Sequence, residues 1–317
     1  MYELTSNEYY AAIRLGKLLG VSPLLIRQVF HLGQENIYVL REQPKPNGEV
    51  RIIEAPIESL RIIQRVILRR LMAFKVSEAA HGGNPGRSIV TNAWPHRNSQ
   101  SIFGIDLEDA FGHARLTLPM EQLGIERKAD FDQFRRLVEV RRMVEVRSRG
   151  VFDHPIFRNQ LPQGAPTSPR LFDLFLGRMD ARLMRLASNT GCIYTRYVDN
   201  IAFSSPKPEI EQGIRHAVLR IVTEKHELPI NEGKTYYTRH ANRPEMPLRT
   251  CGINIIDGEL RLRPDIVEKF RMSLFCAYKS RDRQQINGIL GYAKMVYGPL
   301  PQRLQSVVDR FLPDYYS

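Results

Sequence analysis

The stretch from Cys192 to Ser205 constrains the fold more than any other part of this sequence. Two short runs of strand-forming residues flank a turn at Val198-Asp199-Asn200. Asp and Asn are favoured in turns because their short side chains bond nearby backbone and tolerate unusual backbone angles. The pattern therefore predicts a β-hairpin that carries one carboxylate, Asp199, at its tip. The same residues could also be turn chemistry alone, so the meaning of Asp199 depends on the rest of the chain.

Composition and charge limit the classes of function. The chain has 317 residues, 43% of them hydrophobic, and a formal net charge of +12. A folded protein with excess positive charge favours a polyanionic partner, most simply nucleic acid. No run approaches the roughly 18 apolar residues of a membrane-spanning helix, and the first residues lack a signal-peptide pattern. Three widely spaced cysteines argue against a disulfide framework or a zinc site, so we expect a cytoplasmic protein with no membrane partner.

The apolar spacing predicts mostly helices in the first hundred residues, interrupted by one basic hairpin. We expect helices over residues 5–33 with a break at Pro23, over 57–74, and over 88–94 with a stop at Pro95, and hairpin strands at 37–41 and 50–54.

Short strands and longer helices alternate in the rest of the chain. We expect strands at 101–106, 141–149, 251–256 and 259–262, and helices over 131–140, 170–187, 209–227 and 264–312. Asp257-Gly258 is typical of a tight hairpin turn. Together these elements predict a mixed α+β fold.

Two of the predicted strands end close to an aspartate. Asp106 follows the buried strand at 101–106, and Asp199 lies at the hairpin tip. Adjacent carboxylates repel each other unless a cation is present. Mg²⁺ prefers hard oxygen ligands and takes one or two protein carboxylates together with substrate phosphates. The pair therefore suits a site for two Mg²⁺ ions, which would activate a hydroxyl and stabilise a leaving pyrophosphate.

Three segments, in this order, resemble the palm motifs of reverse transcriptases. They are Phe103-Gly-Ile-Asp-Leu-Glu-Asp-Ala-Phe111, Leu161-Pro-Gln-Gly-Ala-Pro-Thr-Ser-Pro169 and Tyr194-Thr-Arg-Tyr-Val-Asp-Asn200. Asn231-Glu-Gly-Lys-Thr235 resembles the next palm motif, and Arg249-Thr-Cys-Gly252 the grip hairpin after it. The basic hairpin before Arg51-Ile-Ile-Glu-Ala-Pro56 is similar to the fingers. The resemblance covers roughly residues 35–262.

Within that superfamily the sequence is most similar to bacterial retron enzymes. Asn92-Ala-Trp-Pro-His96 fits their Asn-Ala-x-x-His signature. Two positions depart from the pattern. Thr250-Cys251-Gly252 replaces the retron Val-Thr-Gly triplet, and Asp199-Asn200 replaces the usual Asp-Asp of the palm hairpin.

The resemblance implies a right-hand polymerase with an antiparallel-sheet palm. Its predicted parts are a helical N-terminal lead at 1–34, fingers at 35–100, a palm at 101–262 and a helical thumb at 263–317.

The implied catalytic residues are Asp106, Asp199 and Asn200, with Asp106 and Asp199 as metal ligands. An amide oxygen at Asn200 can coordinate a cation, but it carries no charge. Three explanations of Asn200 stay open: a natural variant that tolerates two carboxylates, an inactivating substitution, or a degenerate polymerase.

Five further residues are implied to contact the nucleotide. Arg51 would bind the triphosphate, Phe111 would lie under the incoming sugar and exclude a 2′-hydroxyl, and Gln163-Gly164 would let backbone approach closely. Lys234 would neutralise the leaving pyrophosphate. The alternatives are a solvated strand charge for Arg51, a core ring for Phe111, a helix entry for Gln163-Gly164 and a surface lysine for Lys234.

Asn92 and His96 are implied to help recognise structured RNA, although a histidine after proline is also often a core hydrogen bonder. A basic stretch from Arg135 to Arg149, with Phe131, Phe134 and Phe152 nearby, suits an additional RNA or protein contact.

The resemblance implies RNA-directed DNA synthesis on a cognate structured non-coding RNA, with deoxynucleoside triphosphates as substrates. Retron enzymes make branched RNA-linked DNA and act with an effector protein in anti-phage defence. Two other functions stay open. One is a different bacterial defence reverse transcriptase; the other is an inactive RNA-binding scaffold, for which Asn200 is the only support.

Overall fold

The structure is a computed structural model that describes residues 3–44, 48, 50–116, 122–144, 147–148, 151–152, 156–240 and 246–311. It divides into two compact units built from interleaved segments of the chain. The first comprises 1–78, 107–181 and 226–229, and the second 79–106, 182–225 and 230–317. The predicted limits of fingers, palm and thumb stay predictions.

The first unit begins with α1 (Ser6–Leu19) and α2 (Pro23–Leu32), so the predicted break at Pro23 is confirmed. Thr5 and Glu8 form a reciprocal capping box at the start of α1. Gly20 ends α1 in the left-handed conformation that glycine adopts without a steric penalty.

An antiparallel hairpin follows, as predicted. It pairs β1 (Tyr38–Pro44) with β2 (Val50–Pro56), with Tyr38 opposite Pro56. The amphipathic helix α3 (Glu58–Leu71) comes next and buries its apolar face in the core of the unit.

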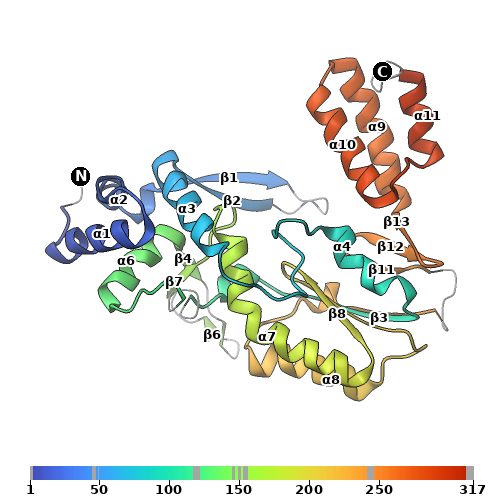
Figure 1. The fold of residues 1–317 in the computed structure, drawn as a ribbon, viewed down its shortest axis with the longest axis horizontal. Helices are drawn as coiled ribbons and strands as arrows, with labels where there is room; N and C mark the ends of the chain where they lie inside the picture. The colour runs from blue at the N-terminus through green and yellow to red at the C-terminus, as the bar shows by residue number, and fades with distance from the viewer. Residues whose placement is uncertain are drawn as a thin grey trace. The chain divides into compact units, whose positions relative to one another are not determined.

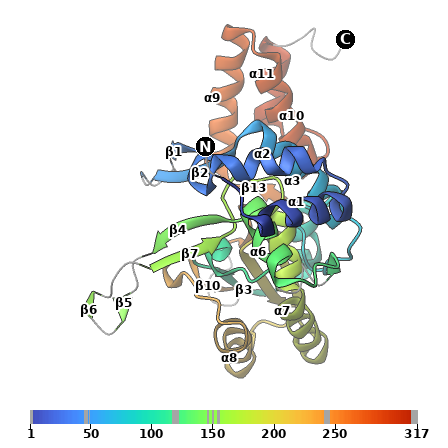
Figure 2. The same ribbon diagram turned by 90° about the vertical axis from the view of Figure 1, so that its left-hand side faces the viewer.

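The remaining elements of the first unit are shorter, apart from two helices. They are η1 (Gln34–Asn36), η3 (Ala110–His113), α6 (Lys128–Val138), β4 (Val140–Val144), β5 (Arg147–Ser148), β6 (Val151–Phe152), β7 (Ile156–Gln160) and the first part of α7 (Ser168–Thr190). Strands β4 and β7 pair antiparallel, and β5 and β6 form a short ladder beyond them (Figure 2). The helix predicted over 131–140 ends at Val138, because Val140 is already paired with Gln160.

The second unit is organised around a four-stranded antiparallel sheet with the order β10-β3-β9-β8, of which Figure 1 labels β3 and β8. Its strands are β3 (Ser101–Asp106), β8 (Ile193–Tyr197), β9 (Asn200–Ser205) and β10 (Tyr236–Arg239). The predicted buried strand and the predicted hairpin are therefore confirmed, and they are neighbours in the sheet.

One face of this sheet is covered by α4 (Ile89–Ala93), the 3₁₀ helix η2 (Trp94–Asn98) and a three-stranded sheet. The predicted helix ends at Ala93, next to the predicted stop, and Pro95 lies in the first turn of the 3₁₀ helix η2, where proline is tolerated. The small sheet contains β11 (Leu248–Thr250), β12 (Ile253–Ile256) and β13 (Glu259–Leu262).

Two tight turns shape this small sheet. Asp257 and Gly258 both have positive φ, 51° and 79°, as in a type I′ hairpin turn. The strand predicted at 251–256 begins only at Ile253, since Cys251 and Gly252 form a second turn of the same kind, with φ of 46° and 79°.

Helices complete the second unit. They are α8 (Gln212–Arg220) with a π-helical turn η4 (Ile221–Lys225), the short η5 (Glu232–Lys234), and three longer helices, α9 (Pro264–Ser280), α10 (Arg283–Tyr297) and α11 (Gln302–Phe311). The last three lie side by side (Figure 1) and share one apolar core with β12 and β13. The mixed α+β class predicted from the sequence is confirmed. Among the described residues, no helix is both long and apolar enough to span a membrane.

Candidate active site

The two aspartates predicted to form a metal site are brought together by strand register. Strands β3 and β9 pair so that Asp106 stands opposite Asn200, and Asp199 immediately precedes Asn200 in the turn. Side chains directly opposite in an antiparallel pair have Cβ atoms about 5 Å apart. The carboxylates of Asp106 and Asp199 and the amide of Asn200 therefore lie at one end of the sheet.

The electrostatics of this cluster suit a cation. Burial and the neighbouring Asp106 carboxylate raise the pKa of Asp199. A hydrogen bond opposes this shift: Asn200 Nδ2 donates to Asp199 Oδ1 at 3.0 Å. Two carboxylates that disfavour each other's charge, together with an amide oxygen, form a hard-oxygen donor set that fits a divalent ion. Among the described residues, no group of three acidic, histidine or cysteine side chains is gathered for metal binding.

Lys234 lies beside this cluster, and its Nζ is 3.2 Å from Asp106 Oδ1. Asn231 makes two hydrogen bonds that position the backbone of Lys234 next to Asp106. The Asn231 backbone N–H donates to the carbonyl of Asp106 at 2.8 Å, and the Asn231 Oδ1 accepts from the backbone N–H of Lys234 at 3.2 Å. The sequence indicated Lys234 by its motif, but it did not reveal the anchoring role of Asn231.

The hairpin turn itself differs from expectation. Asp and Asn tolerate unusual backbone angles, but in this turn Val198 has the positive φ, 55°. This region disfavours a β-branched residue, and such strain is worth about 1–3 kcal/mol. The fully buried Arg196 supports the turn, because its Nη1 donates to the carbonyl of Val198 at 2.8 Å.

A loop before α4 also supports the tip. His81 N donates to the carbonyl of Arg196, and Arg196 N donates to the carbonyl of Ala79, both at 2.7 Å. Just beyond, Gly82 lies so close that a Cβ on it would be 2.6 Å from Val198 N. Local patterns do not reveal either Gly82 or Arg196. An arginine in a strand pattern suggests a solvated charge, and a Gly-Gly pair suggests only a loop.

Asn92 and His96 lie in the interior of the second unit rather than on its surface. Both side chains are fully buried. His96 is hydrogen bonded through both ring nitrogens, to Ser204 Oγ at 2.6 Å and to Thr195 Oγ1 at 2.7 Å. RNA cannot touch either side chain directly in this conformation. The alternative of a core hydrogen bonder therefore describes His96.

The predicted nucleotide contacts Arg51, Phe111, Gln163 and Gly164 belong to the first unit, and Arg51 is exposed on β2. Phe111 is half-buried and packs edge to face on Phe172, with ring centroids 5.2 Å apart. The Phe111 ring is thus a packed residue that still has an exposed part.

Glu54 on β2 holds the Gln163-Gly164 turn. Its carboxylate accepts from Gln163 N at 3.0 Å, and its backbone N–H donates to the carbonyl of Gln163 at 2.7 Å. Gly164 has a φ of 136°, and a Cβ there would lie 2.9 Å from the carbonyl oxygen of Glu54. Only glycine fits both the backbone angle and this close approach.

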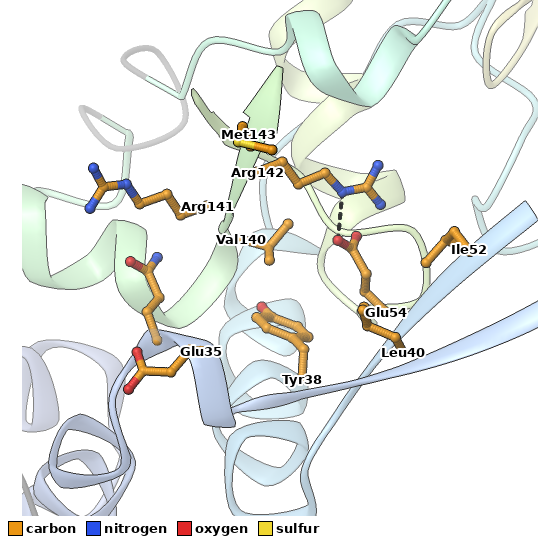
Figure 3. A pocket seen from close by; sticks show the side chains of 10 residues that line it. Glu35, Tyr38, Leu40, Ile52, Glu54, Val140, Arg141, Arg142 and Met143 are labelled. Carbon is orange, nitrogen blue, oxygen red and sulfur yellow. Dashed lines mark hydrogen bonds and ion pairs between the residues drawn. The ribbon is translucent and has the colours of Figure 1, made fainter. Parts of the chain in front are cut away.

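Glu54 also forms an ion pair at the edge of a groove of about 650 Å³ between the β1–β2 hairpin and β4. Arg142 Nε donates to Glu54 Oε1 at 2.6 Å, as the dashed line in Figure 3 marks. Leu40, Ile52 and Met143 line the same groove (Figure 3). Local sequence patterns do not single out Glu54, because its partners Arg142 and Gln163 lie 88 and 109 residues away along the chain.

The basic stretch predicted to contact RNA or protein is partly occupied by internal contacts. Arg135 pairs with Glu139, and Arg136 pairs with Glu8, while Phe134 is fully buried. Residues 145, 146, 149 and 150 lie outside the described residues, and the structure does not describe the side chain of Phe152.

Comparison with known proteins adds an independent finding. The family described as "Reverse transcriptase (RNA-dependent DNA polymerase)" matches residues 43–261. Retron Mx65 reverse transcriptase of Myxococcus xanthus is 32% identical over 298 residues, which cover 90% of this chain and 68% of that protein. Retron Mx162 reverse transcriptase, from the same organism, is 29% identical over 311 residues, which cover 92% of this chain and 64% of that protein.

A solved structure shows the same fold at low sequence identity. Telomerase from Candida albicans, solved with a TWJ fragment of telomeric RNA, is similar with a TM-score of 0.52 and 12% identity. The likeness covers 87% of this chain and 54% of that chain. At this identity it concerns the fold alone.

Proposed function

Because this chain belongs to the reverse transcriptases, the RNA-dependent DNA polymerases, and among them to the retron type, we propose that it copies a cognate structured non-coding RNA into DNA that stays joined to that RNA. The observation that carries the proposal is the register that sets Asp106 opposite Asn200 with Asp199 beside it. A polymerase of this family needs carboxylates at this place, and the sheet supplies two.

The residues at this end of the sheet have different proposed roles. Asp106 and Asp199 would hold two Mg²⁺ ions, which when bound would supply the charge that activates the attacking hydroxyl and stabilises the leaving pyrophosphate. Asn200 holds Asp199 through its hydrogen bond and offers an uncharged oxygen. Lys234, beside Asp106 and mostly exposed, can deliver positive charge to the pyrophosphate.

The residues predicted to contact the nucleotide would select it. The partly exposed ring of Phe111 favours deoxynucleotides by excluding a ribose 2′-hydroxyl, and Gln163-Gly164 presents backbone to the nucleotide. Arg51 has the forked, permanently charged group that suits a triphosphate. The proposed setting is the bacterial cytoplasm, with an effector protein as partner in anti-phage defence.

An inactive RNA-binding scaffold is the second candidate, and Asn200 is the observation that favours it. Primer extension on the co-expressed RNA separates the two. Labelled DNA from the chain as it stands, abolished by Asp199→Ala, supports the polymerase and refutes the scaffold. No DNA from the chain as it stands, but DNA from Asn200→Asp, shows an inactive site whose missing charge can be restored.

The nature of the product tests the retron assignment. A retron enzyme yields DNA that keeps an RNA branch, so its mobility shifts after ribonuclease treatment. DNA that is unchanged by ribonuclease would identify a reverse transcriptase with another way of priming.

A further inference from the structure

A chain of hydrogen bonds runs through the interior of the second unit and joins the two strands of the palm hairpin. His96 Nε2 meets Thr195 Oγ1 on β8, and His96 Nδ1 meets Ser204 Oγ on β9. At one end Ser99 Oγ lies 2.7 Å from Ser204 Oγ. At the other, Thr195 Oγ1 lies 3.2 Å from the backbone carbonyl of Asn92. Every one of these side chains is buried.

The direction of each hydrogen bond follows from the group at one end. The backbone carbonyl of Asn92 can only accept a hydrogen bond, so the single hydroxyl proton of Thr195 is donated to it. Thr195 then accepts from His96, which places the imidazole proton on Nε2. His96 Nδ1 therefore accepts from Ser204, and Ser204 accepts from Ser99. His96 is thus a neutral imidazole in one tautomer.

The Asn92 side chain makes a second set of hydrogen bonds. Its Nδ2 is 3.3 Å from Thr250 Oγ1 and 3.4 Å from Cys251 Sγ. These two residues form the end of β11 and the turn into β12. The Asn-Ala-x-x-His element and the Thr250-Cys251-Gly252 triplet, which are far apart in the sequence, are therefore in direct contact.

We propose that Asn92 and His96 are positioning residues that hold the palm hairpin and the Thr250–Gly252 turn in one fixed arrangement, so that Asp199 stays opposite the strand of Asp106. This inference rests on the proposed polymerase function and assigns no RNA contact to either residue. His96 bridges β8 and β9 below the tip, and Asn92 connects that bridge to the neighbouring sheet.

Two properties of the site support positioning over RNA contact. A residue that neutralises a phosphate must be charged and reachable. Burial lowers the pKa of His96 to about 3, so the imidazole is neutral at physiological pH. The second property is geometric: the hydrogen bonds join four elements, because Asn92 on α4 and His96 on η2 both bond to Thr195 on β8, and His96 also bonds to Ser204 on β9.

The bridge can be tested by removing one hydroxyl without changing shape. Thr195→Val deletes the acceptor of His96 Nε2–H, whereas Thr195→Ser keeps it. Thr238→Val, on β10 of the same sheet, is the matched control. The measurements are kcat and KM on a generic primer–template, the dissociation constant for the cognate RNA, and ¹⁵N chemical shifts of His96.

We expect Thr195→Val to lower kcat about tenfold or more, because small displacements of catalytic groups have large effects on rate. The KM and the RNA dissociation constant should change less than about twofold, and Thr195→Ser should restore most of kcat. The ¹⁵N shifts should show the Nε2–H tautomer in the unmodified chain. A loss of RNA affinity with unchanged kcat, or a charged or Nδ1–H imidazole, would overturn the proposal.

Failure of the proposed function is recognised separately. If the unmodified chain makes no DNA, the tautomer and the hydrogen exchange of β8 and β9 amides still test the bridge. Faster exchange in Thr195→Val than in Thr238→Val supports it, and equal exchange refutes it. If Thr195→Val does not fold, the ¹⁵N shifts of the unmodified chain alone decide.

Discussion

The substitution Gly82→Ala tests how closely the palm hairpin is held in place. A Cβ at position 82 would lie 2.4 Å from Val198 Cγ2 and 2.6 Å from Val198 N. Ordinary contacts of a Cβ begin near 3.4 Å. The hairpin tip, or the loop that carries Gly82, must therefore shift by close to 1 Å.

The expected consequences differ in size for stability and for catalysis. Overpacking of this kind lowers the free energy of unfolding by about 1–3 kcal/mol. A shift of about 1 Å next to a catalytic group lowers the rate about a hundredfold. Because Asp199 follows Val198 directly, most of the effect should appear in kcat rather than in the melting temperature.

Primer extension and thermal unfolding measure the two effects. Gly213→Ala is the matched control, since position 213 lies in α8 with open space around it. Adding Val198→Gly to Gly82→Ala removes the contact with Cγ2 but leaves the contact with the backbone N, so activity should return only in part. Full activity of Gly82→Ala, with an unchanged melting temperature, would refute the reasoning.

Three further predictions concern charge. Asn200→Asp places a third carboxylate about 5 Å from Asp106, so without metal it should destabilise the fold by about 1–3 kcal/mol. Added Mg²⁺ should therefore raise the melting temperature of Asn200→Asp more than that of the unmodified chain. Equal increases in melting temperature would contradict this. Burial lowers the pKa of His96 to about 3, so the unfolded chain takes up a proton below about pH 6.5 while the folded chain does not. Stability should therefore fall as the pH drops from about 6.5, by about 2 kcal/mol at pH 5. The free energy of unfolding of His96→Gln, measured by denaturation, should lack this pH-dependent loss. If the unfolding free energies of the two chains change with pH in parallel, His96 is not a neutral buried imidazole. Glu54→Gln weakens the ion pair with Arg142 and the hydrogen bond that holds Gln163. It should raise the KM for deoxynucleotides several-fold, whereas Glu42→Gln, exposed on the same hairpin, should not. Equal KM values for the two variants would show that Glu54 does not support the nucleotide site.

The sequence predicts those parts of the fold that depend on local patterns. Helices with a long apolar stripe, such as α3, and the strand that ends at Asp106 follow from spacing alone. The convergence of Asp106 with Asp199 was also predictable, because motifs in a fixed order imply a known sheet. The α+β class and the family follow from the same residues.

The parts that could not be predicted depend on partners far away in the chain. His96 gains its meaning from Thr195 and Ser204, which lie 99 and 108 positions later. The residues next to His96 in the sequence cannot distinguish such a buried histidine from one that faces RNA. Arg196 is similar, since nothing in its run of strand residues shows that a buried guanidinium would hold the carbonyl of a strained valine.

The interleaving of the two units has a consequence for synthesis on the ribosome. Strand β3 has its main partner, β9, roughly a hundred residues later, which takes about 5–20 s to synthesise. The sheet is complete only after β10 emerges, and the first unit waits for residues 226–229. During that interval the segment Ser101-Ile-Phe-Gly-Ile105 is an unpaired apolar strand that is prone to aggregate. The strand that delivers Asp106 is therefore the one that a cell making this protein must shield longest.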